Sequence, residues 1–165
     1  MVYNSQDYDI FIGIDVDQKS FSFTVKDHGQ MNRSHRIPAD PENLYRHIEN
    51  TYIGKRIICA YETGGSGYYL HDYLTSRDIR CLMVPPVSIP KAGNDRTKNN
   101  RLDSERISQH LKNGDMSPIR VPDYDFRELR QLIRSRQDYV SLGRITKQRI
   151  KALLLFSYLN PSIKD

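Results

Sequence analysis

The sequence has no unbroken apolar run of the roughly 18 to 20 residues that a membrane-spanning helix needs. Its first ten residues, MVYNSQDYDI, are acidic and polar, whereas a signal peptide begins with positive charge followed by an apolar stretch. Nine glycines and eight prolines are ordinary usage, and 38% apolar residues are too many for a disordered or fibrous chain. We therefore expect a cytoplasmic protein with no membrane partner, folded as one globular domain with at most a small appendage.

Cysteine is scarce as well. Cys59 and Cys81 lie in the apolar runs RIICAY and RCLMVP, a setting typical of small buried hydrophobic residues. A disulfide between them would need neighbouring strands, and nothing in their spacing asks for one. No cluster of cysteine and histidine suggests a zinc site.

The charge is unevenly distributed along the chain. Residues 1–90 carry 9 basic and 11 acidic side chains, whereas residues 91–165 carry 16 and 9. A net charge of +5 concentrated in the second half favours a polyanionic partner, because Lys and Arg contacts to phosphates supply sequence-independent affinity for nucleic acid. The alternative is a basic helix face that meets only solvent.

The first part of the chain alternates strand and helix patterns. Strands are predicted at residues 9–16, 20–26 and 31–37, the last completing an antiparallel meander, and further strands at the apolar runs 56–62 and 79–84. Asp40-Pro41 opens a helix between the third and fourth strands, and a second helix is predicted over about 66–76. Residues 88–100 have the composition of a loop, and a helix at 101–111 ends at Gly114.

The second part is dominated by one long helical pattern. Residues 125–159 contain no proline and keep a broken apolar stripe with a period of about 3.5 to 3.6 residues. This pattern predicts a long helix or helical hairpin, and its unpartnered stripe favours a homodimer or tetramer. The expected organisation is a domain at 1–116, then a connector and long basic helix at 117–165 that begins a helical or coiled-coil region.

Acidic residues lie where two predicted strands end and where a later helix begins. Asp15 ends the first strand, Glu62 ends the strand after the first helical crossover, and Asp103 lies on the helix after the last strand. If the two strands are parallel neighbours, Asp15 and Glu62 leave the sheet at the same edge, where open α/β sheets place ligands. Carboxylates there are candidate ligands for Mg²⁺, with Mn²⁺ as a substitute. Each acid also has a structural alternative. Asp15 would begin a turn, Glu62 would be a surface acid at a strand end, and Asp103 would cap its helix or pair with Arg106.

Four segments carry a resemblance to a known family. They are GIDVDQKSFSF, YETGGSGYYLHDYL, PPVSIPKAGNDRTKNNRLDSERI and VPDYDFRELRQLIRSRQDYV, and they span nearly the whole chain. In this order they resemble the N-terminal part of the DEDD transposases and recombinases, the insertion-sequence family numbered one-ten, together with the Piv-type DNA invertases. The resemblance implies an α/β fold: an RNase H-like (RuvC-like) mixed sheet flanked by helices and followed by the long helix or hairpin. It also implies Mg²⁺-dependent DNA strand cleavage and exchange, guided in the transposases by a structured RNA.

The resemblance assigns catalytic positions residue by residue. The family's first two acids fall on Asp15 and Glu62, and its last two lie three residues apart, where this sequence has Asn100 and Asp103. Side chains three apart on a helix share a face, so two carboxylates there would share a metal. Asparagine still offers an amide oxygen to Mg²⁺ but lacks the charge, which weakens metal affinity. The sequence leaves open whether Asn100 is natural, engineered or the mark of a degenerate element.

The family also has a C-terminal domain with a serine proposed as the nucleophile, and no segment of this chain matches it. The chain alone is therefore expected not to complete recombination. Several basic residues flank the acids or line the long helix and are candidate contacts to nucleic acid: Lys91, Arg96, Lys98, Arg101, Arg130 and Arg134.

Two other functions fit parts of the sequence. The start IGID followed by a hairpin also resembles the first phosphate motif of sugar kinases and actin-like ATPases, but the Gly-rich segment TGGSG lacks the lysine of a P-loop. A non-catalytic nucleic-acid-binding or dimerisation module fits Asn100, the basic second half and the long helix. Divalent metal distinguishes this module from a nuclease, because only the nuclease requires metal at Asp15, Glu62 and Asp103.

Overall fold

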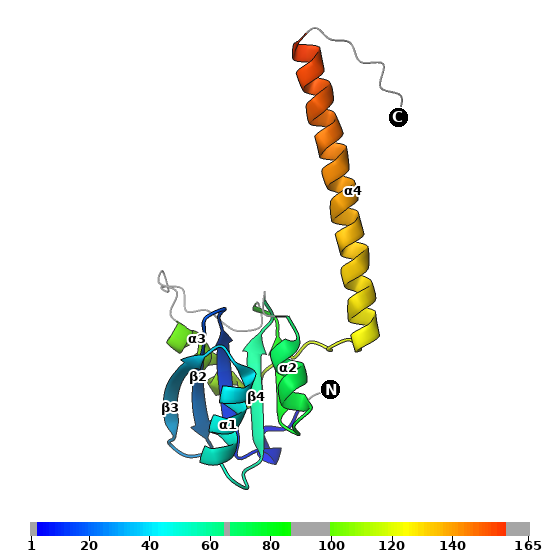
Figure 1. Ribbon diagram of the computed structural model, residues 1–165. Coiled ribbons are helices and arrows are strands. Elements are labelled where there is room, and N and C mark those ends of the chain that lie inside the picture. Colours follow the sequence, from blue (N-terminus) through cyan, green and yellow to red (C-terminus); the bar gives the residue numbers. More distant parts are fainter. Residues whose placement is uncertain (1–2, 65–66, 87–99, 158–165) are drawn as a thin grey trace. The chain divides into compact units, whose positions relative to one another are not determined.

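The computed structural model describes residues 3–64, 67–86 and 100–157 (Figure 1). Contacts divide the chain into two compact units, Met1–Val121 and Pro122–Asp165. In the described residues, the first unit contains a five-stranded sheet with helices on both faces, and the second contains a long helix.

The sheet has the strand order β3-β2-β1-β4-β5. A short 3-10 helix η1 (Ser5–Asp7) precedes the strands β1 (Ile10–Val16), β2 (Ser20–Asp27), β3 (Asn32–Pro38), β4 (Ile57–Glu62) and β5 (Arg80–Val84). The first three strands pair antiparallel as a meander, whereas β4 pairs parallel with β1 and β5 parallel with β4. The strands lie within one residue of where the sequence predicted them, and the predicted mixed α/β sheet is confirmed.

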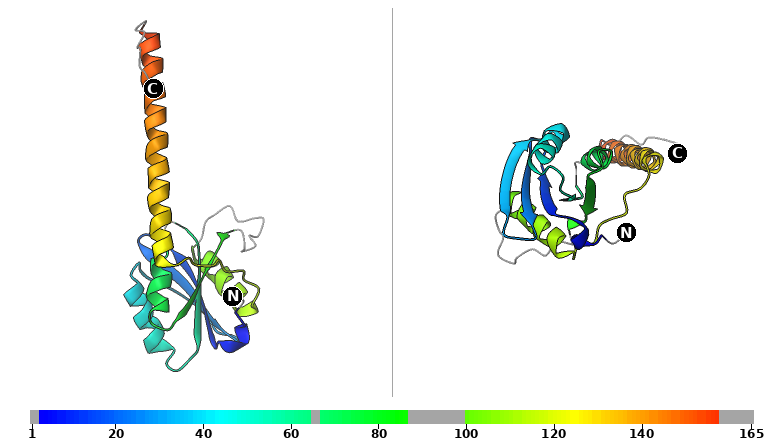
Figure 2. Two further views of the ribbon diagram at one scale, coloured as in Figure 1. Left: turned by 90° about the vertical axis from the view of Figure 1, so that its right-hand side faces the viewer. Right: turned by 90° about the horizontal axis from the view of Figure 1, so that it is seen from below.

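Helices cover the two faces of this sheet (Figure 2). The helices α1 (Pro41–Thr51) and α2 (Tyr69–Thr75) lie over one face, and α3 (Asn100–Asn113) lies over the other. Successive residues of a strand point to opposite faces, so β1 serves two hydrophobic cores. Ile12 and Ile14 pack in the core under α1 and α2, and Phe11 packs in the core under α3.

Local signals explain where the helices begin and end. Asp40 caps α1 by accepting a hydrogen bond from the Glu42 amide at 3.0 Å, and Pro41 occupies the first turn, as the sequence predicted. Gly114 follows α3 with a φ of +79°, a left-handed conformation that glycine adopts without strain. The start of α2 at Tyr69 lies three residues after the predicted one. Of the loop predicted at 88–100, residues 88–99 fall outside the described residues, and Asn100 already belongs to α3.

The two cysteines lie in the core as predicted. Cys59 and Cys81 are register partners in the neighbouring strands β4 and β5, and both are buried free thiols. Burial raises the pKa of each thiol well above its ordinary value, so neither forms a reactive thiolate in the folded protein.

The second unit contains α4 (Tyr124–Phe156), an unbroken helix of 33 residues with no buried residue. The predicted long element is thus a single helix over these residues rather than a hairpin. The connector before it belongs to the first unit up to Val121, because Ile119 and Val121 pack on the core and the Ile119 amide donates to the Met83 carbonyl at 2.8 Å. None of the helices in the described part of the chain is both long and apolar enough to cross a membrane.

Candidate metal and nucleic-acid site

The strand register places one row of polar residues across four strands. Ile14 of β1 lies beside Tyr61 of β4, and Asp15 and Glu62 are the next residue on each parallel strand. On its other side Asp15 is paired with Ser22 of β2, which is paired with Arg36 of β3. Directly paired residues point to the same face of a sheet, so all four side chains of this row point to the α3 face.

The neighbouring row toward the other end of the strands is covered by α3. It consists of Ala60, Gly13, Thr24 and Ser34, in strand order from β4 to β3. The missing side chain of Gly13 leaves room for the backbone of α3, which approaches at Ser104 and Ser108. The row that contains Asp15 and Glu62 therefore lies near the start of α3, at the edge of the sheet formed by the carboxyl ends of β1 and β4.

Buried hydrogen bonds fix α3 on the meander. The Thr24 and Ser104 hydroxyl oxygens are 2.9 Å apart in the buried interface. Farther along the helix, Glu105 accepts a hydrogen bond from the Asn32 side-chain amide at 2.8 Å and forms a 3.7 Å ion pair with Lys26. Glu105 thus anchors the helix. The same anchoring holds Asp103, one residue before Ser104, at the start of α3.

The predicted acids differ in their surroundings. Asp15 is half-buried, with its Oδ2 atom shielded from solvent, and Glu62 is half-buried at the end of β4. Asp103 forms an ion pair with Arg106 at 3.7 Å, the structural alternative that the sequence offered for it. Within the described residues, no group of three or more His, Cys, Asp or Glu side chains is placed to hold a metal ion. The structure brings Asp15 and Glu62 together through the strand register and does not join Asp103 to them in such a group.

The predicted basic contacts are scattered. Lys91, Arg96 and Lys98 lie outside the described residues. Arg101 is exposed on the first turn of α3, at the same end of the helix as Asp103. Arg130 and Arg134 line one side of α4 in the second unit, where the Arg130 guanidinium lies 5.4 Å from the centre of the Phe126 ring.

Arg36 was missed by the sequence analysis. It lies on the edge strand β3, is exposed, and donates a hydrogen bond from its Nε to the Ser20 hydroxyl at 3.0 Å. The available signal was the alternation of Ser20, Ser22 and Thr24 in β2, which marks a polar sheet face that β3 must extend.

Comparison with known proteins was made on the whole chain. A family model described as transposase, of the DEDD type of insertion sequence IS110, matches residues 12–159. The protein y4qE of Sinorhizobium fredii (strain NBRC 101917 / NGR234), whose name gives it provisionally as a transposase, is 30% identical over 149 residues, covering 88% of this chain and 38% of that protein. The transposase for insertion sequence element IS1533 of Leptospira borgpetersenii is 23% identical over 151 residues, covering 88% of this chain and 43% of that protein.

Among solved structures, the large terminase nuclease of the thermophilic phage G20c is similar. Its zinc-bound crystal structure has a TM-score of 0.38 and 18% identity, covering 67% of this chain and 63% of that chain. Its magnesium-bound structure has the same score and identity, covering 66% and 57%.

The α/β sheet and the sequence match together define the class of protein. The chain belongs to the DEDD transposase family of insertion sequence IS110, as its four motifs predicted. It spans about two fifths of the length of the curated relatives it matches.

Proposed function

We propose that this chain is the N-terminal, RuvC-like part of a DNA transposase that cleaves and exchanges DNA strands in a Mg²⁺-dependent reaction. Family membership supports the DNA recombination class. The observation that carries the proposal is the adjacency of Asp15 and Glu62, which end neighbouring parallel strands and point to the same face of the sheet. We assign the catalytic positions to Asp15, Glu62, Asn100 and Asp103.

The chemistry of the donor set fits a divalent metal. Asp15 and Glu62 offer hard carboxylate oxygens from a rigid sheet, and α3 starts at the same edge with Asn100 and Asp103. Asp15, Glu62 and Asp103 would hold Mg²⁺, or Mn²⁺ in its place. When bound, the metal supplies charge stabilisation and activation of an oxygen nucleophile for in-line displacement at phosphorus.

The protein's own residues contribute position and charge. The buried Thr24–Ser104 contact holds the start of α3 against the sheet, so Asp103 is carried on a fixed element. Arg101 on the first turn of α3 adds a positive charge that attracts phosphate to the same edge. The neutral amide of Asn100 lowers the negative charge of the site relative to a fourth acid and thereby weakens metal binding.

The partners proposed are DNA, a structured guide RNA and further copies of the chain. Arg130 and Arg134 lie on one side of α4, and we assign them to contact with nucleic acid. The same helix exposes apolar side chains over its length, which favours pairing with another copy as a dimer or tetramer. These residues include Leu129, Leu132, Ile133, Val140, Ile150 and Leu153.

Titration of Mn²⁺ into the protein, followed by isothermal calorimetry, tests the proposal. We expect binding to the natural chain, tighter binding to the Asn100→Asp variant, and loss of binding in Asp15→Asn. Asp138→Asn is the matched control, because it removes one exposed carboxylate from α4, in the other unit of the chain.

Equal Mn²⁺ binding by Asp15→Asn and Asp138→Asn would contradict the metal site. Absence of binding to both the natural chain and Asn100→Asp would also contradict it and would favour a non-catalytic nucleic-acid-binding module.

A further inference from the structure

We propose that Arg36 binds a backbone phosphate of the DNA strand that enters the acidic site. This inference rests on the proposed function, because it takes the edge of Asp15 and Glu62 as the place where DNA reacts. It assigns a binding role to β3, a strand that neither the motifs nor the predicted basic contacts include.

Arg36 is aligned with the two acids across the sheet. Glu62, Asp15, Ser22 and Arg36 form one row on one face of the sheet, immediately beyond the row that α3 covers. Neighbouring β-strands are about 4.8 Å apart, so β3 lies about 10 Å from β1. This distance suits a phosphate that lies close to the reacting one on the same DNA strand. The row thus carries two acids and one cation on one face, and Ser22 between them is buried.

In the described part of the chain, the Arg36 side chain is not paired with an acid. Some arginines of the first unit form ion pairs, as in Arg46 with Glu42, Arg56 with Asp9 and Arg106 with Asp103, whereas others, such as Arg33, form none among the described residues. Within the described residues, Arg36 forms no such ion pair, and its hydrogen-bond partner is the Ser20 hydroxyl at Nε. That contact orients the guanidinium and leaves its two terminal NH₂ groups for a phosphate, which arginine binds through paired hydrogen bonds.

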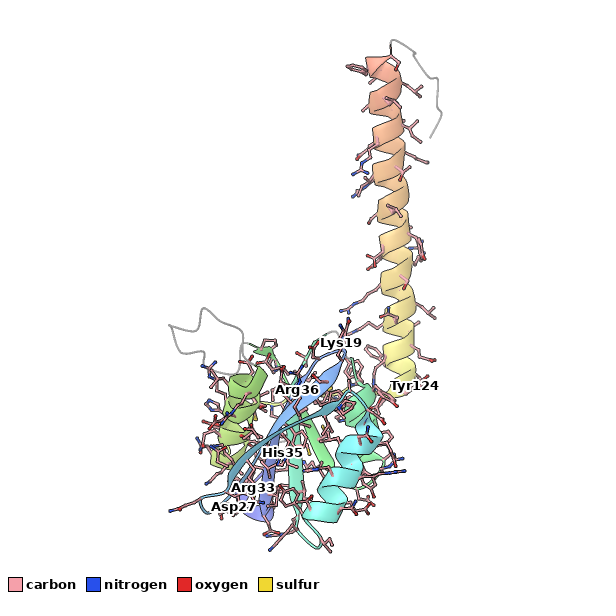
Figure 3. The ribbon with its side chains drawn as sticks, turned by 60° about the vertical axis from the view of Figure 1, so that its left-hand side comes forward. Lys19, Asp27, Arg33, His35, Arg36 and Tyr124 are labelled. Atoms are coloured by element: carbon pink, nitrogen blue, oxygen red, sulfur yellow. The ribbon has the colours of Figure 1, made fainter. Side chains whose placement is uncertain are left out.

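A second cation, Lys19, lies toward the same end of the sheet as Arg36. Lys19 is exposed in the turn between β1 and β2, and its carbonyl accepts a hydrogen bond from the Ala39 amide just after β3. Figure 3 shows Lys19 and Arg36 toward the same end of the sheet, with Arg33 and Asp27 toward the opposite end. Lys19 and Arg36 at the acidic edge would each contact one of two successive phosphates on a DNA strand.

Arg33 on the same strand provides a matched control. Its side chain points to the opposite face, since it is three residues from Arg36 and alternate residues of a strand share a face. Charged residues also protect edge strands against pairing with other chains. If edge protection were the role of Arg36, replacement of either arginine would have the same effect on DNA binding.

The test is fluorescence anisotropy with a labelled single-stranded DNA oligonucleotide, in chelator, over a series of salt concentrations. We expect Arg36→Ala to weaken DNA binding about tenfold, as for the loss of one hydrogen bond to a charged group. In a plot of the logarithm of the binding constant against the logarithm of the salt concentration, the slope should become shallower by about 0.7, as for the loss of one phosphate contact on single-stranded DNA. Arg36→Lys should recover part of the affinity, because lysine also binds phosphate.

Arg33→Ala should leave both affinity and slope unchanged, and Ser20→Ala should give a smaller loss than Arg36→Ala with the edge strand intact. Thermal melting of each variant checks that the sheet is folded. Equal affinities for Arg36→Ala and Arg33→Ala would overturn the proposal. A loss confined to RNA of the same sequence would overturn the assignment to DNA.

The chelator separates this result from the metal site. If Mn²⁺ does not bind but Arg36→Ala still weakens DNA binding, the proposed metal chemistry fails and the phosphate contact stands. If Mn²⁺ binds and the two arginine variants behave alike, the phosphate contact fails and the metal site stands.

Discussion

Gly13 of β1 and Ser104 of α3 approach so closely that a Cβ atom at Gly13 would lie 2.2 Å from the Ser104 carbonyl oxygen and 2.3 Å from the Ser108 amide nitrogen. Both obstacles are backbone atoms, so a side chain there can be accommodated only if the helix moves. Glycine at this position therefore determines how near the start of α3, with Asp103, lies to the ends of β1 and β4.

Gly13→Ala is expected to destabilise the first unit by about 1 to 3 kcal/mol, the usual cost of overpacking a core. Urea unfolding followed by circular dichroism measures this change. Gly143→Ala is the matched control, because nothing lies within 4 Å of a Cβ there and glycine is a poor helix former. It should stabilise α4 by about 1 kcal/mol. Similar unfolding midpoints for Gly13→Ala and the natural chain would contradict the close approach.

The half-buried pair His35 and His47 predicts a pH dependence of stability. Their rings lie 4.7 Å apart, and the buried Nε2 atom of each has no hydrogen-bond partner among the described residues. Burial, together with repulsion from His47 and Arg33, lowers the pKa of His35 below its ordinary value of 6.5. The unfolded chain therefore binds a proton that the folded chain does not, and stability falls as the pH drops below about 6.5.

His35→Phe keeps a ring stacked on Phe23 and removes the titrating group. Between about pH 6.5 and 5, the natural chain should lose more of its unfolding free energy than the variant. The other histidines are common to both proteins, so the difference isolates His35. Parallel stability curves for the two proteins over this range would show that His35 titrates normally.

The exposed apolar stripe of α4 predicts a self-associating chain. Ile133 lies in this stripe next to Leu129 and Arg130, whereas the exposed Ser141 lies outside it, about 120° around the helix from Leu129. Ile133→Asp should shift the sedimentation coefficient from that of an oligomer to that of a monomer, because a buried unpaired carboxylate opposes association. Ser141→Asp should leave the oligomer intact. A monomer for the natural chain would contradict pairing through α4.

Most of the fold could be predicted from local patterns. Alternating residues in β2 and the apolar run of β4 gave strands with the correct bounds within a residue, and Asp40-Pro41 marked the start of α1. The start of α2 was less accurate because its first turn has no side-chain cap. The contact between Gly13 and α3 was not predictable, because it joins segments some 90 residues apart that carry no shared local signal.

The candidate site could be predicted in part. Strand-end acids are visible in a sequence, and the parallel pairing of β1 and β4 places Asp15 beside Glu62 as expected. Arg36 could not be assigned to the same row without the register of two antiparallel pairs, since a shift of one residue would turn it to the other face. The ion pair of Asp103 with Arg106 was one of two possibilities that only the structure distinguishes.

Anomalous diffraction from Mn²⁺-soaked crystals, collected for the natural chain and for Asn100→Asp, tests the central claim most directly. Mn²⁺ replaces Mg²⁺ at oxygen ligands and gives an anomalous signal that locates it. The account predicts a Mn²⁺ peak at Asp15, Glu62 and Asp103 in both crystals, with higher occupancy in Asn100→Asp. An ordered acidic edge with no Mn²⁺ peak in either crystal would contradict it.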